Sequence, residues 1–333
     1  MRGLGDFMVL ITGGAGYIGS LLTYNLLASS YKVRVFDNLM YGGESLLGAY
    51  HNPNFEFIKG DIRNKLEVEN AIKGCEVVVH LAAIVGYPVC KANPDAAIAI
   101  NREATKQLVD ICQNHIISRF VFASTYSNYG RSEDEKPVTE ASPLLPQSLY
   151  AETKIDAEKY ILSKASNGFP AVVLRFATVF GVSPRTRFDL MVNQFTAEAV
   201  IKKKLVVYQP EFQRSFVHVQ DVTRAIQLAL ELPGEKVAGE IFNVGGDLLN
   251  YTKRELANLV QKIVGGVQLE FIEAGYDGDM RSISVSYNKI KNQLGFRTTK
   301  EIDDGIVEVK NAIDQGVIAD PFSPKYREKP GES

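Results

Sequence analysis

The 333-residue sequence is poor in the residues that build metal centres and disulfide frameworks. It has three cysteines, Cys75, Cys90 and Cys112, which lie far apart and form no CxxC pair, and only four histidines. Zinc sites and disulfide-rich secreted domains place their cysteines at short, regular spacings. We therefore expect no metal site, no disulfide framework and a cytoplasmic, reducing location.

The sequence also lacks a strong charge bias and a long hydrophobic run. Its 37 lysines and arginines oppose 39 aspartates and glutamates, and the net charge of -2 gives no global field to hold nucleic acid or an anionic membrane. The apolar run at residues 7–11 is too short for a signal peptide core, and residues 77–85 fall short of a membrane span. An apolar content of 45% is that of an ordinary globular protein, which we expect to be soluble.

Short runs of β-branched or aromatic residues alternate with helical patterns through the first half of the chain. Residues 95–115 and 148–166 have the length and the period of helices. Such alternation is typical of βαβ units, whose parallel strands are buried on both faces. We expect strands at residues 7–11, 32–36, 55–58, 76–80, 119–124 and 171–176. The pattern predicts an α/β fold with a doubly wound parallel sheet.

After Gly181 the rhythm becomes irregular, and we expect a smaller, partly discontinuous second domain. The expected elements are strands at residues 216–219 and 241–244 and helices at 221–231 and 252–264. The predicted first domain comprises residues 1–181 with 214–245 returning to it, and the second comprises 182–213 and 246–333. The three lysines at 202–204 are interpreted as a solvated helix end, because charge runs usually are.

The stretch LITGGAGYIG, residues 10–19, follows the first expected strand and leads into a helix. Its glycines, Gly13, Gly16 and Gly19, form GxxGxxG, a relative of the dinucleotide fingerprint GxGxxG. The first permits a tight turn, the second lets backbone N–H groups approach a diphosphate at the positive helix end, and the third allows close helix–strand packing. A plain strand–turn–helix packing motif gives the same pattern, so other residues must decide.

Asp37 ends the second expected strand, in the sequence VRVFDN. An acidic residue at this place in a dinucleotide-binding unit accepts hydrogen bonds from the adenosine ribose hydroxyls. Its charge would repel a 2′-phosphate, and no arginine follows it directly, so NAD is favoured over NADP. The alternative is a strand-end turn of Asp37 and Asn38.

Tyr150 and Lys154 form YAETK on an expected helix, where a spacing of four puts both side chains on one face. A tyrosine with a pKa of about 10 is a poor base at neutral pH. The lysine ammonium and the positive nicotinamide of NAD would favour the phenolate, and a shift of ~3 units requires about 4 kcal/mol. Ser124 and Thr125 end a buried strand, RFVFAST, and offer a hydroxyl to the same substrate oxygen. Each piece is common alone, and their combination indicates catalysis.

These motifs follow one another in a fixed order with several others. The set comprises TGGAGYIG at 12–19, Asp37, GDIR at 60–63, HLAA at 80–83, ASTYSNYG at 123–130, Tyr150-xxx-Lys154, LRFATVFG at 174–181 and RSFVHVQDV at 214–222. This order resembles that of the extended short-chain dehydrogenase/reductases, specifically the NAD-dependent nucleotide-sugar epimerases and dehydratases, over nearly the whole chain. The resemblance implies a Rossmann domain that binds NAD, a smaller C-terminal α/β domain for a nucleotide-sugar, and a homodimer through the helices at about 95–115 and 148–166.

The resemblance also implies roles for individual residues. Thr125, Tyr150 and Lys154 match the catalytic positions, with Tyr150 as the base. The cofactor-binding positions are Gly13, Gly16, Tyr17, Ile18, Gly19, Asp37, Asn38, Asp61, Ile62, Ala82, Ala83, Tyr150 and Lys154. The substrate-binding positions are Thr125, Tyr126, Thr178, Arg187, Arg214 and Arg281. Of these, Arg214 and Arg281 fall where family members hold the nucleotide phosphates, a task that suits the guanidinium fork.

Two departures from the family pattern bear on the reaction. The dehydratases follow their catalytic threonine with Asp-Glu, which remove the C6 hydroxyl, whereas this chain has Tyr126 and Ser127. Uronate decarboxylases carry a glutamate at the position of Ser127. In addition, Thr178 stands where many members have an asparagine that contacts the nucleotide-sugar. With FGVSPRTRFDL at 180–190, it resembles certain bacterial surface-polysaccharide enzymes, some of which are GDP-heptose 4-dehydrogenases.

The hypothesis is therefore an NAD-dependent nucleotide-sugar 4-epimerase of the UDP-glucose type, since transient oxidation at C4 needs neither carboxylate. Tyr150 takes the 4-hydroxyl proton, Thr125 shares that hydrogen bond, and hydride leaves C4 and returns to the other face. Two alternatives stay open: a 4-dehydrogenase that releases the keto sugar, and a non-catalytic NAD-binding sensor of the same fold. His80, at a strand end, and His218, placed mid-strand, are interpreted as packed, hydrogen-bonded residues.

Overall fold

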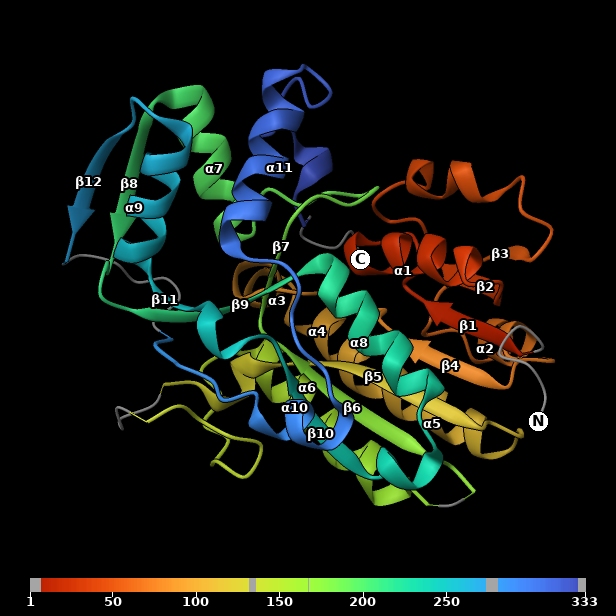
Figure 1. The fold of residues 1–333 in the computed structure, drawn as a ribbon. Coiled ribbons are helices and arrows are strands. Elements are labelled where there is room, and N and C mark those ends of the chain that lie inside the picture. The colour runs from red at the N-terminus through yellow and green to blue at the C-terminus, as the bar shows by residue number, and fades with distance from the viewer. Residues whose placement is uncertain (1–6, 132–135, 167, 274–280, 329–333) are drawn as a thin grey trace.

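A seven-stranded parallel sheet forms the centre of the protein in the computed structural model, which describes residues 7–131, 136–166, 168–273 and 281–328 (Figure 1). Every neighbouring pair of strands in this sheet is parallel. The spatial order is β10 (Glu240–Val244), β6 (Ala171–Phe176), β5 (Arg119–Thr125), β4 (Val77–His80), β1 (Met8–Thr12), β2 (Lys32–Asp37) and β3 (Phe55–Lys59). Because the strand order reverses between β1 and β4, the topology is that of a Rossmann fold, as expected.

Helices cover both faces of this sheet, and its side chains alternate between two buried clusters. Val9 and Ile11 of β1 belong to one cluster, while Leu10 belongs to the other. The first face carries α1 (Tyr17–Ala28), α8 (Val219–Glu231) and α10 (Asn288–Leu294), and the second carries α2 (Lys65–Ala71), α5 (Thr105–Gln113) and α6 (Leu149–Lys164). This double burial explains why the strands read as continuous apolar runs.

A second group of elements packs beside the carboxyl ends of the strands. It contains a three-stranded sheet of β11 (Asn250–Thr252), β9 (Gln213–His218) and β7 (Thr178–Phe180), and a parallel pair of β12 (Gln268–Ile272) and β8 (Lys204–Tyr208). Helices α7 (Met191–Lys202), α9 (Lys253–Val264) and α11 (Ile302–Asp314) pack with them around a separate apolar cluster. Residues 283–296 pack instead with the cluster of the large sheet. The domain boundaries given above remain a prediction.

Most expected elements form within a residue or two of their expected bounds, and the differences have local causes. The expected helix at 95–115 is divided into α4 (Pro94–Ala97), a π-helical turn (Ile98–Ala104) and α5, after the short α3 (Tyr87–Ala92). His218 does not lie mid-strand: it is the last residue of β9, and its Nδ1 accepts the Gln220 N–H (3.2 Å) as the N-cap of α8. Of the three lysines, Lys203 ends α7 in the left-handed region (φ 52°), and Lys204 begins β8.

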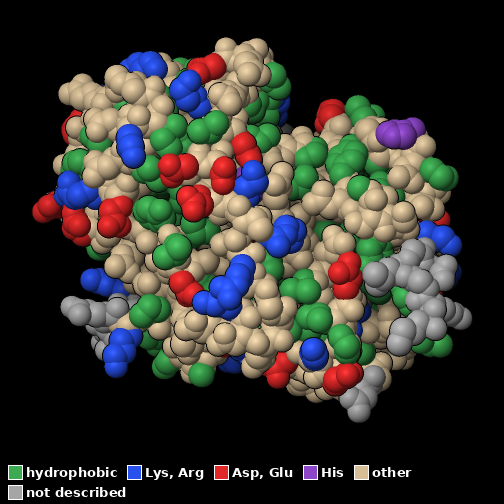
Figure 2. All heavy atoms as spheres, viewed as in Figure 1, with side chains coloured by type: hydrophobic (Ala, Val, Ile, Leu, Met, Phe, Trp, Pro, Cys, Tyr) green, Lys and Arg blue, Asp and Glu red, His purple; other side chains and the backbone are tan. Residues whose placement is uncertain are grey.

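The face of the molecule seen in Figure 2 carries charges of both signs. Figure 2 shows lysine and arginine side chains scattered among aspartates and glutamates over the face in view. None of the helices formed by the described residues is long and apolar enough to cross a membrane. Within the segments of the predicted homodimer, residues 95–115 and 148–166, Arg102 of the π-helical turn pairs with Glu103 (2.6 Å) and with Asp156 of α6 (3.5 Å). The dimer remains a prediction.

Candidate active site

One cleft runs along the carboxyl ends of the parallel strands, where ligands bind in sheets of this type. The structure brings every site residue expected from the sequence to its lining, with the exception of Arg214. Residues expected to hold the cofactor line the side next to β1, β2 and β4, and the expected catalytic residues follow β5 and begin α6. The rest of the lining includes Arg185, Arg187, Leu190, Arg281 and Glu328.

The glycine loop between β1 and α1 is shaped for a diphosphate. Gly13 has φ +75°, and a Cβ there would lie 2.7 Å from the backbone nitrogen of Ala82. A Cβ on Gly19 would collide with the carbonyl of Gly13. The N-cap of α1, Gly16, has no side chain to bond the first-turn amides. These amides and the helix dipole therefore offer an anion site at the cleft.

Two carboxylates lie at the adenosine end of the cleft. Asp37 accepts the N–H of Ala15 at Oδ2 (3.0 Å) and the N–H of Leu39 at Oδ1 (2.8 Å), which leaves each oxygen a further lone pair for a ribose hydroxyl. Burial raises the pKa of Asp37, and the two amides oppose that rise. Asp61 is paired with Arg63 (2.7 Å), whose hydrogen bonds lower its pKa. The roles of both residues toward a nucleoside remain predictions.

Thr125, Tyr150 and Lys154 meet at the centre of the cleft. Thr125 is the last residue of β5, and its Oγ1 donates to Ser127 Oγ (2.9 Å) and accepts the Ser127 N–H (3.1 Å). Tyr150 lies in the first turn of α6, capped by Ser148. Lys154 lies one turn later, where its Nζ donates to the carbonyl of Ala123 (2.9 Å) and lies 4.6 Å from the Phe122 ring centroid. The turn of α6 therefore faces the end of β5.

Burial sets the protonation of this group. It raises the pKa of Tyr150 above its usual value of 10, while the charges of Arg187 and Arg281 and a hydrogen bond with Thr125 oppose the rise. Burial also lowers the pKa of Lys154 to about 8. We expected Lys154 to be the cation that favours the phenolate. In the structure the charges of two arginines that line the cleft oppose the rise, and the effect of Lys154 on Tyr150 stays a prediction.

A buried ion pair behind the catalytic residues joins α6 to the sheet. Arg175 of β6 donates to Glu158 of α6 through Nη2 (2.6 Å) and Nε (3.0 Å). Glu158 also accepts from Ser124, next to Thr125, and from the Asn128 amide (2.9 Å). Sequence reasoning missed this pair. The signals were present, since Glu158 follows Lys154 by one more interval of four, and Arg175 is a lone charge inside the apolar strand AVVLRF.

His80 is a packed residue, as expected, and its tautomer can be derived. Thr105 Oγ1 donates to the carbonyl of Asn101 (2.8 Å), so it accepts the Nε2–H of His80 (2.9 Å). The Nδ1 atom of His80 then accepts the Thr12 hydroxyl (2.7 Å). Burial and the charge of Lys154 lower the pKa of His80 to about 3, so it stays neutral and holds β4 against β1.

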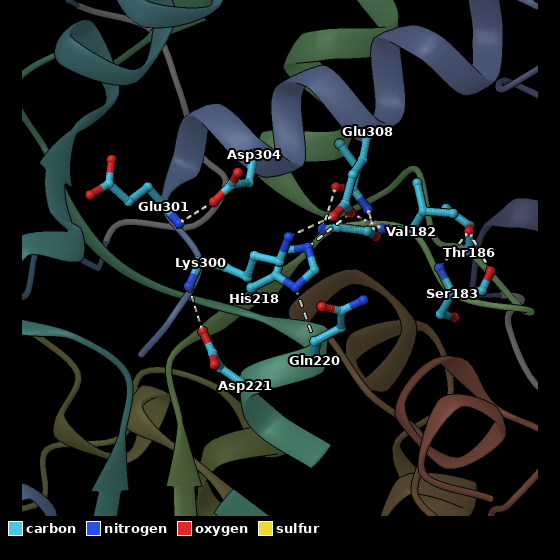
Figure 3. A network of polar contacts seen from close by, with 12 residues as sticks. Val182, Ser183, Thr186, His218, Gln220, Asp221, Lys300, Glu301, Asp304 and Glu308 are labelled. Atoms are coloured by element: carbon cyan, nitrogen blue, oxygen red, sulfur yellow. Dashed lines mark hydrogen bonds and ion pairs between the residues drawn. The ribbon is translucent and has the colours of Figure 1, made fainter. Parts of the chain in front are cut away.

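His218 is also buried and hydrogen-bonded, between α8 and α11 (Figure 3). Since its Nδ1 accepts the Gln220 N–H, its Nε2–H donates to Glu308 (2.9 Å). The side chain fills the space above Gly181 (φ +101°), where a Cβ would collide with the imidazole. Glu308 also accepts the Val182 N–H (3.3 Å), so this pair anchors the chain where it leaves β7.

Of the residues expected to bind the substrate, most line the cleft and one, Arg214, does not. Tyr126 and Thr178 share a hydrogen bond between their hydroxyls (2.8 Å), and Arg281 donates to Ser127 and lies over the Tyr126 ring (5.4 Å). These residues face the cleft. Arg214 is buried behind them and donates to the backbone carbonyl of Arg281. Its predicted contact with a phosphate stays a prediction.

Sequence reasoning also missed two residues that line the cleft, Arg185 and Glu328. Arg185 Nη1 donates to Glu328 Oε1 (2.7 Å), and its guanidinium lies 4.2 Å from the Tyr41 ring centroid. They are separated by most of the C-terminal half of the chain, and no local pattern in the sequence joins them. The Glu328 side chain is only 4% exposed. Acidic side chains are almost never buried to this extent unless they are paired, and here the partner is Arg185.

The fold and the cleft define a dinucleotide-binding enzyme of the Rossmann class, with a tyrosine and a lysine on one helix facing a hydroxyl at a strand end. The sequence model of the NAD dependent epimerase/dehydratase family matches residues 9–245. The chain belongs to this family, and NAD is its cofactor.

Relatives and solved structures of similar build carry out more than one reaction. The chain is 31% identical to a dTDP-glucose 4,6-dehydratase of Actinoplanes sp., over 90% of this chain and 95% of that protein. It is 28% identical to a putative UDP-glucose 4-epimerase of Methanocaldococcus jannaschii, over 91% and 97%. The UDP-glucuronic acid 4-epimerase of Bacillus cereus, in complex with UDP-glucuronic acid and NAD, superposes with a TM-score of 0.82 at 26% identity, over 92% of this chain and 99% of that one. The chain is accordingly an NAD-dependent enzyme that modifies nucleotide-sugars.

Proposed function

We propose that the protein is a nucleotide-sugar 4-epimerase, which inverts C4 of an NDP-hexose of the UDP-glucose type through a 4-keto intermediate. The observation that carries this proposal is the chemistry next to Thr125. Dehydration would need an acid and a base for loss of the C6 hydroxyl, in addition to the group that oxidises C4. Among the residues that the structure describes, the carboxylates lining the cleft are Asp37, Asp61 and Glu328.

None of these three carboxylates is placed to remove a C6 hydroxyl. Asp37 and Asp61 are bound to backbone amides and to Arg63 at the ends of β2 and β3, and Glu328 is bound to arginines. At the two positions after Thr125 the side chains are hydroxyls, and both are engaged: Tyr126 with Thr178, and Ser127 with Thr125 and Arg281. This arrangement supports reversible oxidation at C4 and does not supply the two proton carriers of a dehydratase.

The residues of the chain can perform the proton transfers of epimerisation. Tyr150 takes the proton of the 4-hydroxyl as the sugar is oxidised and returns it when C4 is reduced on the other face. Thr125 holds the same oxygen through its hydroxyl, and Lys154, fixed by the carbonyl of Ala123, orients the nicotinamide ribose. Bound NAD supplies the hydride acceptor and donor that this exchange requires. The glycine loop and Asp37 hold it, as the cradle at Gly13 and the lone pairs of Asp37 permit.

The test is product analysis on a panel of nucleotide-sugars. The purified protein with NAD is incubated with UDP-glucose, UDP-N-acetylglucosamine and GDP-sugars, and the products are followed by proton NMR. An epimerase gives an equilibrium mixture of two C4 epimers from one or more of these substrates. A stable 4-ketone with reduced nicotinamide would instead establish the 4-dehydrogenase, and a 4-keto-6-deoxy product would establish a dehydratase.

Two variants make the test specific. Tyr150→Phe removes the base and should lower the rate of conversion by roughly 10²–10⁴-fold, while the bound cofactor and the fold are kept. Val307→Ala, at a half-exposed residue of α11 outside the cleft, is the matched control and should convert at the wild-type rate. NAD bound without turnover of any nucleotide-sugar would point to a sensor of the same fold.

A further inference from the structure

The last described residues of the chain return to the cleft and pack on the segment that lines it. The backbone N–H of Phe188 donates to the carbonyl of Tyr326 (2.9 Å), and the two rings meet edge to face at 5.5 Å. Arg185 Nη2 donates to the carbonyl of Arg327 (3.2 Å), and the Glu328 N–H donates to Asp189 (3.4 Å). The last described residues, 326–328, therefore lie against residues 185–189.

This contact inserts the Glu328 carboxylate between two arginines. Its Oε1 lies 2.7 Å from Arg185 Nη1 and 3.2 Å from Arg187 Nε. Arg187 donates both Nε–H (3.0 Å) and Nη2–H (2.8 Å) to Asp189, so its contact with Glu328 is an ion pair without a hydrogen bond of its own. The cluster thus holds two cations and two anions, and removal of the Glu328 charge would leave a net charge of +1. Both arginines and Glu328 line the cleft.

Arg185 and Arg187 lie in the part of the cleft where a bound diphosphate is expected. Arg185 lies over Tyr41, in the loop that follows Asp37 at the adenosine end. Arg187 lines the cleft together with Tyr17, in the first turn of α1, and Tyr150, and its charge opposes the rise in pKa that burial causes at both tyrosines. Guanidinium forks bind carboxylate and phosphate with the same geometry. A carboxylate held by two arginines in such a place marks a built anion site.

We propose that Arg185 and Arg187 form a diphosphate-binding site that the chain's own C-terminal segment occupies with the Glu328 carboxylate. A diphosphate ester and the C-terminal segment then compete for the two guanidinium groups. The diphosphate belongs either to NAD or to a nucleotide-sugar, and the second source rests on the function proposed above. Binding of the ligand releases Glu328 and loosens the contact between residues 185–189 and 326–328.

The test compares the affinities of Glu328→Gln and of the wild type for ligands that contain a diphosphate, under conditions without turnover. Glutamine keeps the shape of the side chain and removes its charge, so the diphosphate meets less competition. We expect affinity to rise roughly tenfold for the ligand that uses the site, since hydrogen bonds between charged groups are the strong ones. The gain should shrink in high salt. UDP, dTDP and GDP titrated into the NAD-loaded protein report the nucleotide-sugar source, and the release rate of bound NAD reports the cofactor.

Two controls separate this effect from a general change in charge or fold. Glu235→Gln removes an exposed carboxylate outside the cleft and should bind as the wild type does. The double variant Arg185→Met, Glu328→Gln should lose most of the gain. In the wild type, hydrogen exchange of peptides that contain Phe188 and Glu328 should quicken when the ligand binds, because their N–H bonds to Tyr326 and Asp189 open.

Equal affinity of Glu328→Gln and the wild type for all these ligands would overturn the proposal. So would slower exchange of the C-terminal segment on binding, since that would make Glu328 a clamp over the ligand rather than its competitor. Because all readouts are binding and exchange, failure of the epimerase assay leaves this test intact. An active epimerase with unchanged binding would refute this inference alone.

Discussion

Replacement of Glu158 by glutamine should destabilise the protein strongly, because it leaves Arg175 as a buried charge without its counter-ion. Both side chains are almost fully buried, at 2% and 3% exposure. Breaking a buried pair by removing one partner costs about 3–5 kcal/mol. Glutamine can keep the bond to Arg175 through its carbonyl oxygen, so we expect the lower end of this range. For a large domain about 1 kcal/mol shifts the Tm by roughly 2 °C, which gives a decrease of about 6 °C.

Differential scanning calorimetry of the wild type and Glu158→Gln measures this decrease. The control is Glu270→Gln, which breaks the surface pair with Lys204 (2.7 Å), whose side chains are 46% and 47% exposed. Exposed pairs contribute ~1 kcal/mol or less, so this variant should stay within about 2 °C of the wild type. Equal Tm values for the two glutamine variants would refute the argument that burial makes the inner pair different.

The same substitution should also lower turnover, because Glu158 joins Ser124 of β5 to the helix that carries Tyr150 and Lys154. A second variant, Glu158→Gln with Arg175→Met, removes both charges. It should recover most of the lost Tm, since it leaves no buried charge without a counter-ion. If the double variant is as unstable as the single one, the loss comes from packing and not from the orphaned charge.

Four other predictions address the cleft. Tyr150→Phe should lower turnover by roughly 10²–10⁴-fold with an unchanged circular dichroism spectrum, as loss of a general base does. Gly13→Ala should abolish NAD binding in titration calorimetry, because its Cβ would meet Ala82 at φ +75°. Asp37→Ala should weaken the binding of NAD more than the binding of NADP, and so reduce the preference of the protein for NAD over NADP. Burial lowers the pKa of Lys154 to about 8 from 10.5, so between these pH values the unfolded chain binds more protons than the folded one. The free energy of unfolding of the wild type should therefore rise by ~3 kcal/mol from pH 8 to pH 10.5, relative to that of Lys154→Met. Denaturant unfolding of both proteins across this pH range measures the difference.

The large sheet could be predicted from the sequence because its signals are local. Parallel strands buried on both faces form apolar runs, and all seven strands of the sheet were expected within one or two residues of their observed bounds. The strands β7, β8, β11 and β12 were not expected, since they are short, partly exposed and stabilised by partners distant in the chain. The role of His218 at the end of β9 was also not predicted. The pattern FVHV indicates a residue within a strand, whereas the imidazole of His218 caps α8.

The candidate site was predicted to the extent that it depends on motifs. The glycine loop, Asp37 and the pair Tyr150 and Lys154 are fixed by spacing within one strand or one helix, and the structure gathers them in one cleft. The charges that act on Tyr150 could not be predicted in this way. Arg187 and Arg281 reach it from segments beyond the sheet, and their field depends on tertiary packing.

The two sides of the cleft therefore contribute differently to the chemistry. The strand ends provide a rigid floor that holds the cofactor and fixes Thr125 and Tyr150. The opposite wall includes Arg185, Arg187, Leu190, Arg281 and Glu328, and the charges of Arg187 and Arg281 oppose the rise in the pKa of Tyr150 that burial causes. That wall is held by hydrogen bonds and ion pairs between loops rather than by a sheet. Because such contacts can be exchanged for contacts to a ligand, the proton affinity of Tyr150 should respond to what the wall binds, whereas its position should not.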